Sequence, residues 1–314
     1  MFANLQVLNA NGELEPMRSA MTMRQLMSHT AGFAYVLTTA TPVDQMYRDQ
    51  RVLERSSNLQ EMIAKLAKLP LAYQPGTHWH YSVSVDIQGY LVEKLSGQRF
   101  DDFLRTRLFV PLGMTDTDFA VAAAKLPRLV TVHTRNEQGA LQPAPEILNA
   151  AATIRPGLLS GGGGLFSTAT DYYRFCQMLL NNGELNGVRI LKPETVALMH
   201  SNQLPEGVGI GGGTGGTFPG QQFGLDFAIF TGAGAAGADR AQPKGTYWWG
   251  GAFGTWFWID PTNEIVMVGM IQYRARPNFT RTTPSATNAA AQAAGRVDVR
   301  QQSAELVYSA LAPE

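Results

Sequence analysis

The chain has 314 residues, of which 45% are apolar and 16% are charged, and its 25 basic and 25 acidic residues give a formal net charge of zero. This length and composition are typical of a soluble globular enzyme with a sizeable core, and the balanced charge gives no support for a nucleic-acid or membrane-surface partner. The one cysteine excludes an intrachain disulfide, and no apolar run approaches the length of a membrane span.

The first hundred residues are predicted to be mainly helical. Residues 1–21 are irregular or extended and lack the charged and apolar regions of a signal peptide, so we expect a cytoplasmic location. Apolar residues at helical spacing, with suitable start and stop signals, then predict four helices. These cover residues 22–28 with Thr22 as the start signal, 57–68 with Pro70 as the stop, 84–96 with Gly97 as the C-cap, and 101–108.

The pattern changes from helix to strand in the second half of the chain. A helix opens at residues 167–171, and its free thiol, Cys176, is expected to be a buried core side chain. Alternating and β-branched residues predict three later strands, and the last two are joined by a hairpin turn. The remaining predictions are loop for 120–156, helix for 193–200, strand for 223–230, loop for 232–243, strands for 255–259 and 265–271, a mobile surface segment for 274–297, and helix for 300–311.

This order of elements predicts an α+β fold, with helices first, then an antiparallel sheet and a closing helix. We expect two lobes with one active-site cleft between them. Residues 1–21 and 220–314 would form an α/β lobe with the sheet, and residues 22–219 would form a mainly helical lobe.

Several familiar catalytic motifs are absent from the sequence. It contains no HExxH, no GxGxxG after a strand, no phosphate-binding loop and no GxSxG. His78 and His80 have the spacing of two metal ligands, but no Cys, Asp or third His lies nearby, so they are interpreted as loop residues. We therefore expect no metal and no organic cofactor.

Five segments, in order along the chain, resemble motifs of the β-lactamase-related serine hydrolase superfamily, which has the class C β-lactamase and penicillin-binding protein fold. The resemblance is closest to the family VIII carboxylesterases. The segments are Thr22 to Gly32 (T-x-R-x-L-L-x-H-T-S-G), Pro75 to Ser82 (PG-x-x-x-x-YS), Phe109 to Thr117 (F-x-PLGM-x-DT), Gly162 to Asp171 (GGG-L-x-ST-x-x-D) and Trp249 to Thr255, which is similar to the third active-site motif.

The resemblance implies a serine nucleophile in an S-x-x-K motif, with a lysine and a tyrosine sharing the acid and base work. Tyr81 matches the catalytic tyrosine, against the alternative of an ordinary half-buried tyrosine. Trp249, Gly250 and Gly251 match the third motif that binds substrate, where glycine leaves room for an acyl group. The amide of Ala252 would stabilise the oxyanion, and His29 is interpreted as structural rather than catalytic.

The sequence departs from the family pattern at the nucleophile. None of its serines is followed by lysine three residues later, and in the family that motif precedes the segment that matches Thr22 to Gly32. We therefore expect the chain to be N-terminally truncated relative to the family, with part of the fold missing. An exposed sheet edge and an inactive or much slower chain would follow.

A second departure concerns the substrate. Val83 and Trp249 stand where β-lactamases have an asparagine and a cationic or histidine residue, which favours a small uncharged ester as the substrate. The expected function is a carboxylesterase that forms an acyl-enzyme. An acyltransferase or weak β-lactamase of the same fold, and a catalytically dead fragment or binding protein, remain as alternatives, and the oligomeric state stays open.

Overall fold

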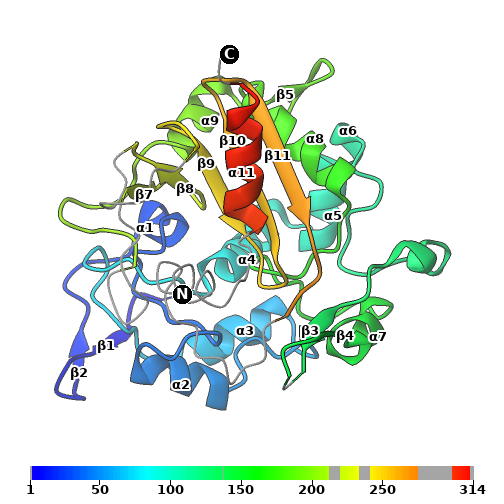
Figure 1. Cartoon of the computed structure of the whole chain (residues 1–314). Helices are drawn as coiled ribbons and strands as arrows, with labels where there is room; N and C mark the ends of the chain where they lie inside the picture. Colours follow the sequence, from blue (N-terminus) through cyan, green and yellow to red (C-terminus); the bar gives the residue numbers. More distant parts are fainter. Residues whose placement is uncertain (1, 137, 212–219, 233–240, 275–298, 312–314) are drawn as a thin grey trace.

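Figure 1 shows the computed structural model of the chain, which describes residues 2–136, 138–211, 220–232, 241–274 and 299–311. Helices of the first half surround the central helix α4, and a five-stranded sheet packs above them (Figure 1). The helices are α1 (Met23–Met27), α2 (Pro42–Asp49), α3 (Leu59–Leu66), α4 (Ser84–Ser96), α5 (Phe100–Leu104), α6 (Val110–Leu112), α7 (Asn149–Ala152), α8 (Ala169–Leu180), α9 (Pro193–Met199) and α11 (Val299–Ser309).

The predicted helices of the first half form close to their expected positions because their end signals are satisfied. Thr22 caps α1 in a capping box with Gln25, and Thr41 and Asn58 do the same for α2 and α3. Gly97 ends α4 in the left-handed conformation, as its position predicted. The helix α2 was not predicted from the sequence, although Thr41-Pro42-x-Asp44 carries its start signal.

The five-stranded sheet is antiparallel throughout, in the order β11-β10-β9-β8-β7. Among the described residues β11 pairs only with β10, so it forms one edge of the sheet. The strands are β7 (Gln221–Phe223), β8 (Ala228–Phe230), β9 (Tyr247–Gly250), β10 (Thr255–Asp260) and β11 (Ile265–Met270), and the short hairpins are β1 (Gln6–Leu8) with β2 (Leu14–Pro16), β3 (His133–Arg135) with β4 (Leu141–Pro143), and β5 (Glu184–Leu185) with β6 (Val188–Arg189).

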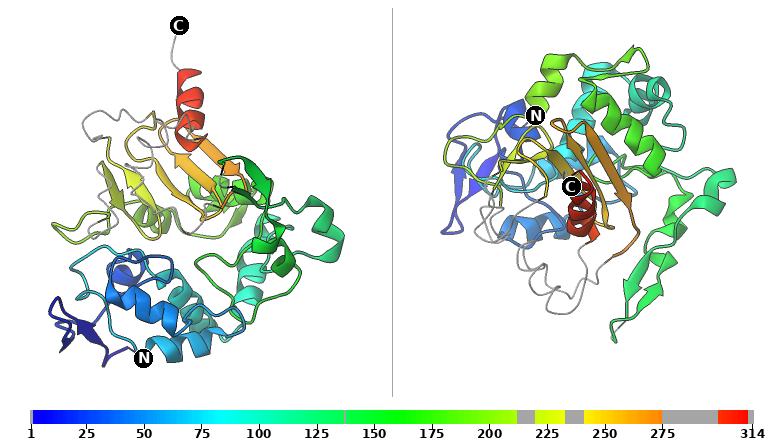
Figure 2. Two further views of the ribbon diagram at one scale, coloured as in Figure 1. Left: turned by 60° about the horizontal axis from the view of Figure 1, so that its bottom comes forward. Right: turned by 45° about the horizontal axis from the view of Figure 1, so that its top comes forward.

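One helix covers each face of this sheet. Apolar side chains of α8 pack against Phe257 and Ile259 of β10 on one face. Ala304 of α11 packs against Trp256 and Trp258 on the other face, which Figure 2 shows as α11 lying across the strands. Alternate residues of a strand point to opposite faces, so the run Thr255 to Ile259 serves both layers.

The N-terminal residues are an exception to the predicted division into lobes. Leu5 and Val7 are buried in the core of the helical part, and Leu8 and Leu71 are joined by a backbone hydrogen bond of 3.0 Å. The strands β1 and β2 pair with each other and not with the five-stranded sheet. Residues 1–21 therefore belong with the helical part, and their assignment to the sheet lobe was wrong, because their apolar side chains are buried among its helices.

Two further predictions are corrected by the structure. The strand expected over residues 223–230 is two strands, because the chain turns between β7 and β8 with Asp226 in the left-handed conformation. The loop expected over 120–156 contains the β3–β4 hairpin and α7. The segment 274–297 lies almost wholly outside the described residues, as does most of the loop 232–243.

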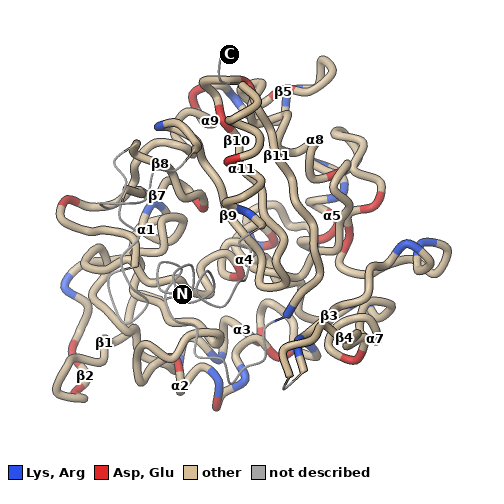
Figure 3. The backbone as a smooth tube through the Cα atoms, in the orientation of Figure 1, with Lys and Arg blue, Asp and Glu red and all other residues tan. Residues whose placement is uncertain are grey.

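The predicted burial of the single cysteine is confirmed. Cys176 is fully buried, and burial raises the pKa of its thiol. Over much of the described chain, Lys and Arg residues alternate with Asp and Glu residues (Figure 3). None of the described helices combines the length and apolar composition that a bilayer span requires.

Candidate active site

Tyr81 lies at the start of α4, on an extended segment that is hydrogen-bonded to the chain after α1. The amide of His80 donates to the carbonyl of His29 at 2.9 Å, and the amide of Val83 donates to the carbonyl of Ala34 at 3.1 Å. These bonds fix the backbone on both sides of Tyr81. The motif Pro75-Gly76 permits the turn before this segment, because Gly76 adopts a φ of 84°.

The ring of Tyr81 is surrounded by aromatic side chains. Ring centroids lie 4.8 Å away for His29, 5.2 Å for Tyr35, 5.3 Å for Trp249 and 6.2 Å for Trp79. Tyr35 meets Tyr81 edge to face at 83°, a favourable arrangement for aromatic pairs. The surroundings of the phenol are thus largely apolar, with its hydroxyl directed at β9.

Trp249 on β9 connects the sheet to Tyr81. Its indole Nε1–H donates to the Tyr81 hydroxyl oxygen at 3.3 Å, across 168 positions of sequence. The structure therefore brings together two residues that the sequence assigned to one site. Trp248, the residue before Trp249, points to the other face of the strand, where it stacks on Phe230 and donates to Gln221.

Gly250 is the last residue of β9, and Gly251 and Ala252 lie in the turn between β9 and β10. A Cβ atom on Gly251 would lie 2.1 Å from the Thr255 hydroxyl, and one on Gly250 would lie 2.7 Å from Nη1 of Arg300. A side chain at Gly251 would therefore require Thr255 to move, whereas the flexible end of Arg300 could give way to one at Gly250. Ala252 follows in this exposed turn, and among the described residues its amide makes no backbone hydrogen bond.

Arg300 is a charged neighbour of the motif that the sequence analysis missed. Its Nη2 donates to the carbonyl of Gly251 at 3.5 Å, which places a guanidinium at the end of β9. The residue lies on α11, 49 positions after Gly251, so sequence spacing gave no signal for this contact.

His29 is buried and makes the structural hydrogen bonds that were predicted for it. Its Nδ1 accepts from the Ser82 amide at 3.3 Å and lies 3.1 Å from the Ser82 hydroxyl. Burial, and then the charge of His80, lower the pKa of His29 to about 3, so its ring is neutral at physiological pH. A neutral Nδ1 can accept the amide proton, which an imidazolium cannot.

The serines nearest to Tyr81 are used in the structure of this segment. Ser82 and Ser84 are both buried, and their hydroxyls are 2.8 Å apart. Ser160 donates to the buried carboxylate of Asp86 at 2.5 Å. Lys125 donates to the Thr115 carbonyl at 2.6 Å. Lys65 donates to the Arg51 carbonyl at 2.9 Å and to the Ser57 hydroxyl at 3.1 Å, and this lysine–serine pair lies on α3 and the turn before it, not on the segment of Tyr81.

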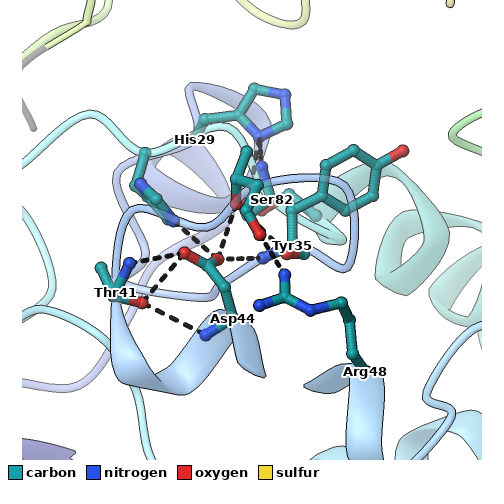
Figure 4. A network of polar contacts seen from close by, with 9 residues as sticks. His29, Tyr35, Thr41, Asp44, Arg48 and Ser82 are labelled. Atoms are coloured by element: carbon teal, nitrogen blue, oxygen red, sulfur yellow. Dashed lines mark hydrogen bonds and ion pairs between the residues drawn. The ribbon is translucent and has the colours of Figure 1, made fainter. Parts of the chain in front are cut away.

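Figure 4 shows a buried carboxylate that the sequence analysis also missed. Asp44 accepts a hydrogen bond from Nε2 of His80 at 3.2 Å, and both side chains are buried. His78 instead stacks on Tyr73, with centroids 4.2 Å apart, and the His80 ring meets the same tyrosine edge to face at 5.4 Å. A polar residue three positions after a Thr-Pro start was the only signal for Asp44 in the sequence.

Comparison with known proteins gives consistent results. Residues 13–292 match the family model described as Beta-lactamase. Protein Rv1367c from Mycobacterium tuberculosis is 34% identical over 267 residues, covering 82% of this chain and 64% of that protein. Esterase EstB from Burkholderia gladioli is 31% identical over 255 residues, covering 76% and 61%. This chain thus spans less than two thirds of the length of these relatives.

Solved structures show the same fold. Simvastatin synthase (LovD) from Aspergillus terreus superposes with a TM-score of 0.70 at 24% identity, over 92% of this chain and 72% of that one. EstCE1, a hydrolase with promiscuous acyltransferase activity, superposes with a TM-score of 0.69 at 24% identity, over 87% and 70%.

Proposed function

The chain belongs to the Beta-lactamase family, whose fold it shares with esterases and acyltransferases, and from that premise we propose that it carries the substrate-binding wall and acid/base tyrosine of a carboxylesterase site. The hydrogen bond from Trp249 Nε1 to the Tyr81 hydroxyl is the observation that carries this proposal. It joins the sheet to the helical part at the residue that would exchange protons with the substrate.

The chemistry follows from the groups around Tyr81. With a serine of the family mechanism, which residues 1–314 do not supply, the hydroxyl would attack the ester carbonyl and give its proton to the Tyr81 phenolate, and the amide of Ala252 would stabilise the negative oxygen of the tetrahedral intermediate. The tyrosine then returns the proton to the departing alcohol, which leaves an acyl-enzyme. A tyrosine of ordinary pKa is almost entirely protonated at neutral pH and so is a weak base there. A hydrogen bond from the Trp249 indole to the phenolate would stabilise the charged form and make proton uptake easier.

The proposed substrate is a small uncharged ester. The half-buried rings of Trp249 and Tyr81 provide apolar surface, and the buried rings of Trp79 and Phe223 pack against them. Val83 is fully buried in the core of the helical part, so it offers no polar contact to a substrate. Apolar walls with few polar groups are typical of sites for neutral ligands.

We also propose that residues 1–314 do not include the nucleophile, so this chain binds esters without turning them over. The sequence has no Ser-x-x-Lys, and the serines beside Tyr81 are buried in structural hydrogen bonds. A chain that has the ester-binding wall but no nucleophile would act as a binding protein, which is the second candidate function. Acyl transfer to an alcohol uses the same groups, and analysis of products with added alcohol separates it from hydrolysis.

Binding of a neutral ester tests the proposed wall. We expect Trp249→Ala to raise the Kd of phenyl butyrate about tenfold, as measured by ligand-observed NMR, because the substitution removes a large aromatic contact surface. Trp248→Phe keeps a ring against Phe230 on the opposite face of β9 and beside Trp249, and should leave the Kd unchanged. Equal effects of the two substitutions, or no binding to the unmodified chain, would exclude this site.

A further inference from the structure

Two residues that flank Tyr81 bond to separate buried anchors. His80 donates from Nε2 to Asp44 at 3.2 Å, and Ser82 donates from its amide to Nδ1 of His29 at 3.3 Å. The His80 amide also donates to the His29 carbonyl at 2.9 Å. The backbone of Tyr81 is therefore held on both sides by bonds of its immediate neighbours.

The Asp44 carboxylate is a rigid anchor because five donors converge on it. Besides His80, it accepts from the Tyr35 amide at 3.0 Å, the Thr38 hydroxyl at 2.7 Å, and the amide and hydroxyl of Thr41 at 2.8 and 3.1 Å (Figure 4). These hydrogen bonds, above all that from His80, outweigh the burial of Asp44 and hold the pKa of its carboxyl well below the usual range. The carboxylate is thus charged and fully satisfied at any physiological pH.

The same carboxylate fixes two neighbours of Tyr81. Through His80 it holds the residue that precedes Tyr81, and through the Tyr35 amide it holds the ring that meets Tyr81 edge to face. The Tyr81 ring also packs against the rings of His29, Tyr35 and Trp79. The Trp249 bond, at 3.3 Å, lies at the long end of the hydrogen-bonding range, so a small displacement of Tyr81 would break it.

We propose that Asp44 and His80 are positioning residues for Tyr81, which set its hydroxyl within hydrogen-bonding distance of Trp249. The inference rests on the proposed function for the role of Tyr81, but its geometry is testable without any substrate. From the sequence, His78 and His80 were considered only as loop residues or metal ligands. The proposal gives the buried His80 a different role.

The five tryptophan indole N–H signals of the 15N-labelled chain provide the measurement, with Trp249 assigned by Trp249→Phe. In His80→Asn the shorter amide stops short of Asp44, and in His80→Gln the longer amide still reaches it. We expect His80→Asn to shift the Trp249 signal and to speed its solvent exchange about tenfold, the loss of one net hydrogen bond. In His80→Gln the signal should stay near its original position.

The other four indoles separate positioning from loss of structure. Trp256 and Trp258 lie under α11, so their signals should not change in a folded His80→Asn chain. His78→Asn alters the exposed neighbour that stacks on Tyr73 and should leave Trp249 unchanged. If His80→Asn unfolds the chain, Thr38→Val, which removes one donor to Asp44, replaces it and should shift Trp249 in the same direction.

Equal Trp249 signals in His80→Asn, His80→Gln and the unmodified chain would overturn the positioning role. So would a shift of all five indoles in a folded variant. Neither result depends on ester binding. Failure of the proposed function would instead appear as no detectable binding of phenyl butyrate, which is a separate outcome.

Discussion

Gly32→Ala is expected to lower the free energy of unfolding by about 3 kcal/mol or more, enough to remove a large part of the stability of a typical domain. Gly32 ends the His29-Thr30-Ala31-Gly32 turn with a φ of 89°, and a Cβ atom there would lie 2.1 Å from the carbonyl oxygen of Tyr73. That carbonyl belongs to the backbone and cannot move aside as a side chain would. The Gly32 carbonyl also accepts from the Ala72 amide at 2.8 Å, which ties the two segments together.

Gly12→Ala is the matched control for this prediction. Gly12 has a similar φ of 80°, but a Cβ atom there meets nothing within 4 Å. The control therefore carries only the cost of the left-handed backbone, about 1 kcal/mol. Urea unfolding of the three proteins measures both effects. Similar losses in the two variants would show that the close approach to Tyr73 is not what requires glycine at position 32.

Asp226→Asn is expected to stabilise the protein above pH 7 and to have little effect near pH 4. Asp226 lies in the β7–β8 turn, where its amide donates to the Met27 carbonyl at 2.9 Å and its carboxyl accepts from Gln88 at 3.2 Å. Burial raises the pKa of this carboxyl to about 7, against the opposing effect of the Gln88 hydrogen bond. The charged form is therefore disfavoured in the folded protein.

The direction of the pH effect follows from this raised pKa. Between pH 4 and 7 the folded state holds a proton that the unfolded state has released, so stability falls as the pH rises and is then constant above 7. The free energy of unfolding lost between pH 4 and 7 is at most about 4 kcal/mol. The actual loss is smaller than this limit because part of the Asp226 side chain stays exposed to water. Asparagine keeps the acceptor for Gln88 and tolerates the left-handed backbone. The difference in unfolding free energy between the two proteins, measured at pH 5 and pH 8, should grow with pH, and an equal difference at both would contradict the raised pKa.

Local signals predicted much of the fold. Thr22, Pro70 and Gly97 mark helix ends that the structure reproduces, because capping and proline effects act within a few residues. The strands of residues 255–260 and 265–270 were predicted from their alternation and the turn between them. The placement of residues 1–21 was not, because the burial of Leu5 and Val7 depends on long-range packing that no local pattern records.

The candidate site was predicted in part, and by resemblance rather than by chemistry alone. Tyr81 and Trp249 were named from motifs, and the structure brings them into contact. Asp44 and Arg300 were missed, and His80 was interpreted only as a loop residue, since each acts through a partner 36 or more residues away in the sequence. Buried hydrogen-bond networks of this kind have no fixed sequence spacing.

The absence of a nucleophile from this chain is the claim that most directly separates binding from turnover. The intact mass of the chain after incubation with a fluorophosphonate, beside a serine esterase that confirms the reagent is active, tests it. We predict no mass shift, because Ser82 and Ser84 are buried in hydrogen bonds and no serine is followed by lysine three residues later. A stoichiometric adduct would contradict the account, and the labelled peptide would identify the serine that acts as the nucleophile.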